Sequence, residues 1–444
     1  MQLSDDFLRE TLATMGSERF ERYLKAFEEE SPVSIRVNPK FGGKRRVESG
    51  EWSVERGERR EESGEMSVVP WCPTGFYLSA RPQFTFDPLL HAGCYYVQEA
   101  SSMFLDEVLR QHLPKDKRVA FLDMCAAPGG KSTLIRSAIS EDSLLVSNEP
   151  VRKRASILLE NLQKWGYANT YVTNNYPKDF RKARLQFDAI LCDVPCSGEG
   201  MFRKDPATIG EWSLANVERC WQLQREIVSD AWQCLSPGGL LIYSTCTLNT
   251  KENEQNVLWM TDELGAELLP VAIKEEWGIT GSLLPGFNQP VYRFIPGITR
   301  GEGLFMAVMR KNSRERRVES GEKRGERRVE SGERILRTLQ REMSILSPLS
   351  SLHSPLNTLP SPLNAPPSPL NTANLDYPTA ISYLRGEAIV LPPDVPRGII
   401  TVSFMGQPLG QVKNIGTRAN NLYPKEWRIK STHVPETYTP IFSL

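Results

Sequence analysis

The sequence predicts an α/β fold with a mostly parallel sheet and an antiparallel hairpin at one edge. Between residues 95 and 311, short apolar runs bounded by Gly, Pro, Asn and Asp alternate with helical patterns. Continuous apolar runs of this length are typical of strands buried on both faces, and their alternation with helices indicates parallel strands joined by crossovers. The last two runs leave no room for a helix between them, which predicts the hairpin.

Five buried strands are expected in this part of the chain: VAFLDM (119–124), SLLVSNE (143–149), TYVTNN (170–175), FDAILCDVP (187–195) and GGLLIYSTC (238–246). The hairpin pairs YRFIPG (292–297) with GEGLFMAVMRK (301–311). Upstream, apolar positions at helical spacing across residues 3–30 predict a helical start, and SIRVNPK (34–40) predicts a short strand. Residues 1–94 are therefore expected to form a small α+β accessory region.

Downstream, residues 374–444 are expected to form a separate β-rich unit. AISYLRGEAIV (380–390) indicates a helix leading into a strand. GIITVSFMGQPLGQVKNIG (398–416) predicts a β-hairpin about Met405-Gly406.

Two low-complexity segments interrupt this plan. A charged repeat of the RRVESGE type fills an insert at 44–66, and it recurs in a linker at 312–373, where a Ser-Pro-Leu run follows it. Segments of balanced charge or abundant Pro bury little apolar surface. We therefore exclude both from the predicted fold.

Composition narrows the possible functions. The 444 residues carry 54 Lys+Arg and 54 Asp+Glu, so any basic surface must be local. Eight scattered cysteines without a CxxC pair, with only four histidines, argue against a disulfide framework and against a zinc site. The acidic start resembles no signal peptide, and no stretch is long and apolar enough to span a membrane. We expect a cytoplasmic, monomeric protein that needs neither metal nor membrane.

The first chemical motif is MCAAPGGKSTL (124–134), a strand that runs into a Gly-rich turn and then a helix beginning near Lys131. Glycines let a backbone approach a ligand closely, and a helix N-terminus offers free N–H groups. A plain βα turn is the alternative. If the Gly-rich turn is a cofactor loop, the loop consists of Cys125, Ala126, Ala127, Pro128, Gly129, Gly130 and Lys131.

Glu149 ends the next strand, nineteen positions after Gly130. An acid there can accept both ribose hydroxyls of an adenosine, as in dinucleotide folds. A solvated carboxylate at the strand end is the alternative. Arg154, in the helix that follows, is a further candidate for cofactor contact.

The third motif, CDVPCSGEGMFRKDP (192–206), places Asp193 and Cys196 just past a buried strand, where open α/β sheets bind their ligands. Cys192 lies within the strand and is expected to pack as a small hydrophobic residue. Gly198 and Gly200 leave room for a large group to approach. The following basic pair, Arg203 and Lys204, suits either phosphate contacts or a solvated surface.

The fourth motif, YSTCTLNTKENE (243–254), ends the next strand at Cys246. If this strand neighbours the one before Cys196, the strands lie about 4.8 Å apart and both thiols open into one crevice. Asn249, Glu252 and Asn253 either cap the following helix or orient the loop, and capping is the simpler interpretation.

Together, MCAAPGGK, DVPCSGEG and YSTCT resemble the NOL1/NOP2/Sun family of RNA cytosine-C5 methyltransferases over residues 95–311. GCYYVQEASSM (93–103) and SIRVNP (34–39) also resemble this family. YLRGE, GQPLG and NNLYPKEWR resemble the PUA-like RNA-binding tail of its bacterial ribosomal-RNA members. The resemblance implies a Rossmann-like, S-adenosylmethionine-dependent methyltransferase domain, an N-terminal accessory region that helps bind RNA, and a C-terminal PUA-like domain.

The resemblance also implies roles. Cys246 matches the nucleophile that attacks C6 of cytosine, and Cys196 matches the cysteine that helps remove the C5 proton and release the product. Asp193 matches the acid that faces both cofactor and cytosine. The turn from Cys125 to Lys131 matches the cofactor loop, and Glu149 matches the ribose-binding acid.

One position departs from the family pattern. Members often carry an Asp after the third strand, near the adenine, where TNNYPKDF (173–180) has Tyr176. Asn175 is the candidate to replace its hydrogen bond.

We therefore expect methylation of cytosine C5 in RNA, with small-subunit ribosomal RNA as the target. Transfer RNA is the alternative target, because transfer-RNA members share the catalytic motifs. A DNA cytosine-C5 methyltransferase would use the PC cysteine, Cys196, as its nucleophile. A non-catalytic ribosome-assembly factor would need neither thiol.

Overall fold

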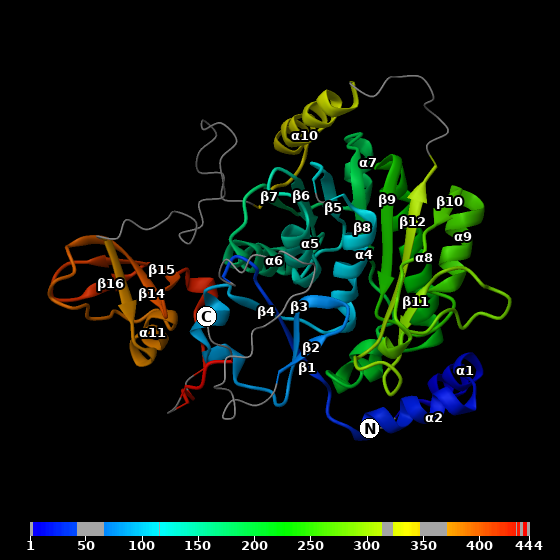
Figure 1. The fold of residues 1–444 in the computed structure, drawn as a ribbon, viewed down its shortest axis with the longest axis horizontal. Coiled ribbons are helices and arrows are strands. Elements are labelled where there is room, and N and C mark those ends of the chain that lie inside the picture. The colour runs from blue at the N-terminus through cyan, green and yellow to red at the C-terminus, as the bar shows by residue number, and fades with distance from the viewer. Residues whose placement is uncertain are drawn as a thin grey trace.

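The computed structural model describes residues 3–41, 66–114, 116–312, 323–346, 371–431, 433–435 and 438–441. They form a large central sheet flanked by two smaller four-stranded sheets, one from each end of the chain (Figure 1). The insert predicted at 44–66 lies outside the described residues apart from Met66, and so does the Ser-Pro-Leu run except at its last residue, Asn371.

The central sheet has the strand order β10-β12-β9-β8-β5-β6-β7, with β11 paired to β12. Its strands are β5 (Ala120–Asp123), β6 (Leu144–Asn148), β7 (Thr170–Thr173), β8 (Phe187–Asp193), β9 (Leu235–Thr245), β10 (Ala266–Leu268), β11 (Tyr292–Phe294) and β12 (Leu304–Lys311). Strands β5 to β9 run parallel, and β12 is antiparallel to β9 and β11. The five strands and the hairpin are confirmed. The short β10, which also pairs with β12, was not predicted.

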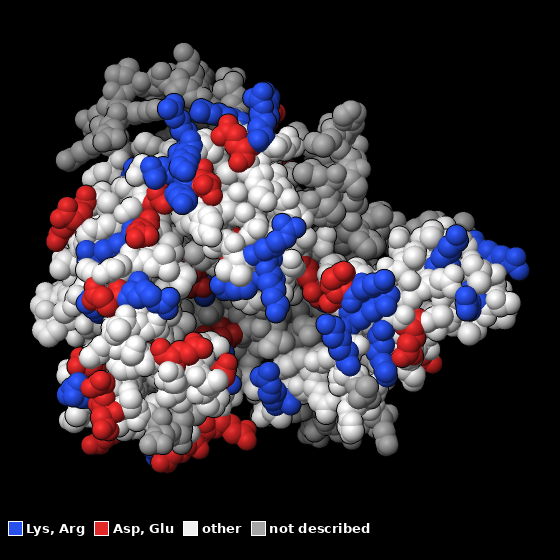
Figure 2. Space-filling view, turned by 180° about the vertical axis from the view of Figure 1, so that it is seen from behind, with Lys and Arg blue, Asp and Glu red and all other residues white. Residues whose placement is uncertain are grey.

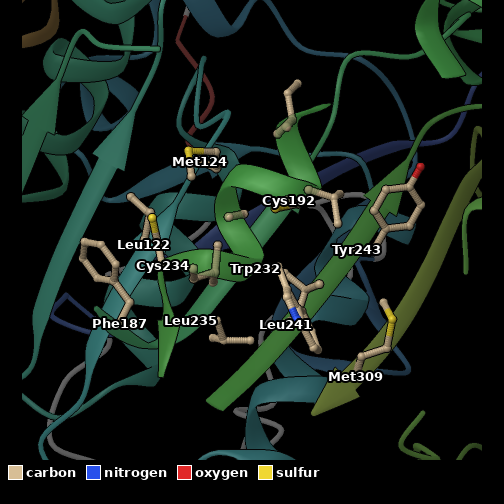
Figure 3. Close-up of a cluster of buried hydrophobic side chains, with 14 of the residues drawn as sticks. Leu122, Met124, Phe187, Cys192, Trp232, Cys234, Leu235, Leu241, Tyr243 and Met309 are labelled. Carbon is tan, nitrogen blue, oxygen red and sulfur yellow. The ribbon is translucent and has the colours of Figure 1, made fainter. Parts of the chain in front are cut away.

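Helices cover both faces of this sheet. They are α4 (Phe104–His112), α5 (Gly130–Ala138), α6 (Arg152–Trp165), α7 (Pro177–Lys182), α8 (Leu214–Gln233) and α9 (Glu254–Leu264). Side chains of α7, α8 and α9 pack on one face, and those of α4 and α5 on the other. Figure 3 shows the first core, in which Trp232 of α8 lies against strand residues such as Leu241. Cys192 is fully buried in this core, as expected of a packed thiol.

The N-terminal unit contains α1 (Asp5–Met15), α2 (Ser17–Lys25), α3 (Pro88–His91), and a sheet ordered β2-β3-β1-β4. Its strands are β1 (Val33–Val37), β2 (Ser67–Val69), β3 (Cys72–Leu78) and β4 (Tyr95–Val97). The helical start and the strand predicted at 34–40 are confirmed. The predicted boundary at 94/95 is wrong, because β4 pairs with β1 and so belongs to the N-terminal sheet.

The C-terminal unit contains α11 (Tyr377–Leu384) and a sheet of β13 (Thr372–Leu375), β14 (Gly398–Phe404), β15 (Gln407–Asn414) and β16 (Ala419–Asn421). The hairpin about Met405-Gly406 is confirmed; both residues have positive φ, as a two-residue type I′ turn requires. The strand predicted within 380–390 reduces to one bridge between Ile389 and Ala419.

This unit packs against the N-terminal unit. Its apolar side chains form one continuous core with those of the N-terminal sheet and α3. Polar contacts reinforce the junction: the Tyr438 hydroxyl donates to Asp87 at 2.9 Å, and the Tyr377 hydroxyl donates to the Phe86 carbonyl at 3.2 Å.

The predicted linker at 312–373 is also corrected. Residues Lys323–Glu342 form α10, and the buried side chains of Ile335, Leu339 and Met343 join the core beneath the central sheet. Ile345 then bridges Thr173, which adds a short antiparallel pairing at the edge of β7. The repeat pattern concealed an amphipathic segment, ILRTLQREMSIL, because the charged residues before it dominate the composition.

Leu339→Asp tests this docking. Burying a carboxylate where a fully buried leucine packs is expected to lower the free energy of unfolding by about 3–5 kcal/mol, measured by urea denaturation. Arg337→Asp on the exposed face of the same helix is the control and should change stability by about 0.5 kcal/mol or less. If both variants lowered the free energy of unfolding equally, α10 would not pack against the core.

Across the described ranges, no helix has both the length and the apolarity to cross a membrane.

Candidate active site

The two thiols meet at the carboxyl ends of β8 and β9. These strands pair in parallel, with Asp193 opposite Ser244, so the loops that follow them begin side by side. The Sγ atoms of Cys196 and Cys246 lie 3.1 Å apart, and the Cys246 amide donates to the Cys196 sulfur at 3.3 Å. The predicted adjacency of the two thiols is confirmed.

Asp193 and Lys131 lie beside this pair of thiols. The Lys131 ammonium donates to Asp193 Oδ2 at 2.8 Å, and the Ser244 hydroxyl donates to Oδ1 at 2.6 Å. Burial lowers the pKa of Lys131, but Asp193 and then Cys246 outweigh it and raise that pKa above its ordinary value. Lys131 therefore places a fixed positive charge close to Cys246.

The Gly-rich turn occupies the neighbouring strand end. Gly129 has φ +118°, a conformation that favours glycine, and α5 begins at Gly130 with its first amides free of helical partners. The Ala126 amide donates to the Asn148 carbonyl at 2.8 Å, which ties the turn to β6. Burial raises the pKa of the Cys125 thiol, which packs against the core.

Glu149 stands at the end of β6 with a buried side chain. Its Oε1 accepts from the Val151 amide at 3.0 Å, and its Oε2 lies 3.3 Å from Arg154 Nη1. Arg154 also donates to the Ala127 carbonyl at 3.1 Å. The structure therefore brings Glu149, Arg154 and the Gly-rich turn together at one place, as expected of residues that bind one ligand.

Sequence reasoning missed Asp123, the last residue of β5. It is fully buried, its Oδ2 accepts from Ser132, and its Oδ1 has no hydrogen-bond partner. Burial is the main cause that raises its pKa to about 7, and the nearby Asp193 adds to it. An orphaned carboxylate oxygen beside a Gly-rich turn fits a bound group that donates hydrogen bonds. The signal was available, since VAFLDM ends on an acid directly before the turn.

Asn175 and Tyr176 do not face the turn as expected. The Asn175 side-chain amide exchanges two hydrogen bonds with the backbone of Ser344, at 3.0 and 3.1 Å. Tyr176 is 62% exposed at the start of α7. Leu346, after α10, packs against the apolar cluster that contains Ala126 and Ala127 of the turn.

The capping interpretation of Asn249, Glu252 and Asn253 is wrong. Asn253 precedes α9 but makes no side-chain cap; it binds the Thr245 hydroxyl and the Thr247 carbonyl instead. Glu252 is fully buried and accepts hydrogen bonds from the loop after Cys196. These residues orient the two loops.

The predictions for the third motif, residues 192–206, also change. Arg203 is buried against Glu302 and donates to the carbonyls of Glu29 and Glu30, so it braces the N-terminal helices, whereas Lys204 is exposed. The close approach at Gly200 is made by the chain itself, since a Cβ there would lie 2.7 Å from the Gly303 carbonyl oxygen.

The fold and site define a Rossmann-like protein of the methyltransferase class, with a Gly-rich turn, a strand-end acid and paired thiols along one sheet edge. Family models match three stretches: 16S rRNA methyltransferase RsmB/F over residues 110–310, the N-terminal domain of 16S rRNA methyltransferase RsmF over 3–100, and the methyltransferase RsmF PUA domain over 370–429. The chain belongs to this RsmB/F family, and the resemblance expected from its motifs is confirmed.

Curated relatives include the ribosomal RNA small subunit methyltransferase F of Aliivibrio salmonicida, 33% identical over 70% of this chain and 64% of the relative. The protein of that name from Escherichia coli O7:K1 is 36% identical over 55% and 52%. The chain thus spans between half and two thirds of these relatives' length. A methyltransferase homolog from Pyrococcus horikoshii matches with a TM-score of 0.56 and 28% identity, over 69% of this chain and 95% of that one. NSun6 from the same organism, solved with SFG, has a TM-score of 0.56 at 22% identity, over 69% and 98%, and shares the fold.

Proposed function

We propose that this protein transfers a methyl group from S-adenosylmethionine to C5 of a cytosine in small-subunit ribosomal RNA. The observation that carries the proposal is the 3.1 Å pair of Cys196 and Cys246 beside Asp193 and Lys131. The names of the RsmF relatives support the choice of RNA.

The residues for the cofactor are the turn from Cys125 to Lys131, Glu149 and Asp123. Glu149 suits ribose hydroxyls, and the unpartnered Asp123 oxygen suits a donor of the bound molecule. When bound there, S-adenosylmethionine supplies an electrophilic methyl group.

The thiols supply the rest. Cytosine C5 is a poor nucleophile until a thiolate adds to C6. Cys246, which lies near the Lys131 ammonium, performs this addition. Asp193, held by Lys131 and Ser244, is placed to stabilise charge at N3 of the ring. Cys196 then takes the C5 proton, the C5–C6 double bond re-forms, and Cys246 leaves as a thiolate.

RNA must present an unstacked base to such a crevice. The balanced charge of the chain is unevenly distributed: on the face shown in Figure 2, Lys and Arg gather between the central sheet and the C-terminal domain, while acidic side chains gather over the N-terminal helices. The basic area suits phosphate contacts, and the PUA-like domain beside it supplies grip by shape. We infer that one chain suffices, as a monomer without metal.

Bisulfite sequencing tests the function. Ribosomal RNA from a strain lacking this gene should lose one 5-methylcytosine of the small subunit, and the wild-type gene, but not its Cys246→Ala variant, should restore it. Loss of marks in transfer RNA alone would assign that substrate instead. Failure of the pure protein to bind S-adenosylmethionine would indicate a non-catalytic RNA-binding factor.

Glu149→Ala tests the cofactor site. Removing a buried carboxylate that accepts charged-group hydrogen bonds is expected to weaken binding of S-adenosylmethionine about 10–100-fold, measured by calorimetry. Asp142→Ala, in the exposed turn before β6, is the control and should leave affinity unchanged. Equal affinity of Glu149→Ala and wild type would remove Glu149 from the site.

A further inference from the structure

Two buried carboxyl groups lie behind Cys196, and neither has a role in the proposed reaction. Glu199 is 4% exposed and Glu252 is fully buried. Among the described residues, no Lys or Arg forms an ion pair with either. Their partners are neutral: Glu252 accepts from the Ser197 amide at 3.1 Å and Gln224 at 2.6 Å, and Glu199 accepts from the Trp212 indole at 3.0 Å. Two buried carboxyl groups without a cation are costly unless hydrogen bonds satisfy them.

Ser197 links the two carboxyl groups. Its hydroxyl contacts Glu199 Oε2 at 3.1 Å, Glu252 Oε1 and Thr247 Oγ1 at 3.0 Å. Asn249 Nδ2 also donates to both carboxyls, at 3.2 and 2.8 Å, and to the Ser197 hydroxyl at 3.2 Å. Burial, followed by the charge of Glu199, raises the pKa of Glu252 to about 7.

This network holds the backbone on both sides of Cys196. Ser197 is bound to Glu252 through its amide, and the Pro195 carbonyl accepts from Gln224 Nε2 at 2.9 Å, the same group that donates to Glu252. The loop after Cys246 joins through Thr247 and Asn249. Cys196 is thereby clamped between neighbours that both depend on one carboxylate.

The charges around the two thiols differ in sign. The contact with Cys246 is the main cause that raises the pKa of Cys196, and burial, Glu252 and Glu199 add to it. Lys131 faces Cys246. The other titratable groups that face Glu252 are Cys220 of α8 and Tyr243 of β9, both neutral when buried.

We propose that the Glu199–Glu252 carboxyl pair is the positioning element that seats the Cys196 loop against Cys246. The pair lies behind Cys196, whereas Lys131 lies near Cys246. The two neighbouring thiols therefore have different surroundings, in keeping with their different roles. This inference rests on the proposed function for its catalytic consequence, but the positioning of the Cys196 loop stands without it.

Alkylation of Cys196 tests the influence of the carboxyl pair on this thiol without RNA. In a Cys246→Ser background, the pH midpoint of Cys196 alkylation by iodoacetamide should fall by about one pH unit on Glu252→Gln, because a like charge is removed. Glu107→Gln, a buried acid outside the crevice, is the matched control and should not move the midpoint. An unchanged or higher midpoint for Glu252→Gln would overturn the proposal. Glu199→Gln gives the same reading if Glu252→Gln fails to fold.

The catalytic arm uses covalent RNA adducts. Glu252→Gln should slow adduct release about a hundredfold in protein that keeps Cys196, yet change adduct formation by less than about twofold in a Cys196→Ala background. A similar loss in both backgrounds would make the pair a general structural support and contradict the inference. Absence of any adduct in Cys196→Ala alone would instead contradict the proposed function, while the alkylation result would still stand.

Discussion

Cys246→Ala is expected to abolish methyl transfer, lowering turnover on the order of 10⁴-fold or more, as loss of a covalent nucleophile does. In Cys196→Ala, Cys246 should still attack the base, but the adduct should not be released. Protein covalently linked to RNA should therefore accumulate. Denaturing gels with labelled RNA measure both outcomes. The structure gives the physical reason, because Lys131 faces Cys246 and the carboxyl pair lies behind Cys196.

Cys192→Ala is the control for these two variants, since its thiol is packed in the core rather than in the crevice. It should lose some stability and form no trapped adduct. Accumulation of adduct by Cys246→Ala, and none by Cys196→Ala, would assign attack to Cys196, as in DNA cytosine-C5 methyltransferases.

Arg293→Ala is expected to lower the free energy of unfolding by about 3–5 kcal/mol. Arg293 and Glu254 are both 0% exposed and form a two-pronged ion pair, with Arg293 Nε donating to Glu254 Oε1 at 2.7 Å. Removing the guanidinium leaves a buried carboxylate uncompensated. It also frees the Leu248 carbonyl, which accepts from Arg293 at 2.7 Å in the loop after Cys246. Urea denaturation measures the loss.

Two comparisons make that result specific. Lys274→Ala breaks an exposed pair with Glu276 and should cost about 1 kcal/mol or less. The double variant Arg293→Met with Glu254→Met should recover part of the lost stability, because no unpaired charge remains. An effect of Arg293→Ala no larger than that of Lys274→Ala would contradict the assignment.

Local signals predicted the sheet and the thiol pair. Runs such as FDAILCDVP are apolar and bounded by turn residues, so strand positions follow from the chain itself. The crevice followed from one further assumption, that the strands before Cys196 and Cys246 are neighbours, and the observed pairing of β8 with β9 satisfies it.

The parts that sequence reasoning missed depend on distant partners. Glu252 matches a helix cap in its local sequence, and only the approach of Ser197, 55 positions away, shows its use. From its local sequence, Asn175 is predicted to contact the cofactor. Its side-chain amide instead donates to the carbonyl of Ser344, 169 positions away. Likewise, β4 follows the predicted N-terminal region in the chain, yet it pairs with β1 and therefore belongs to the N-terminal sheet.

The apolar core shared by the two ends of the chain has a geometric consequence. The C-terminal domain is held in place by packing on α3 and the N-terminal sheet, so the length of the repeat-bearing connection does not determine its distance from the thiols. Lengthening a loop costs little once its ends are fixed. The repeats can therefore expand or contract while the distance between the C-terminal domain and the two thiols stays constant.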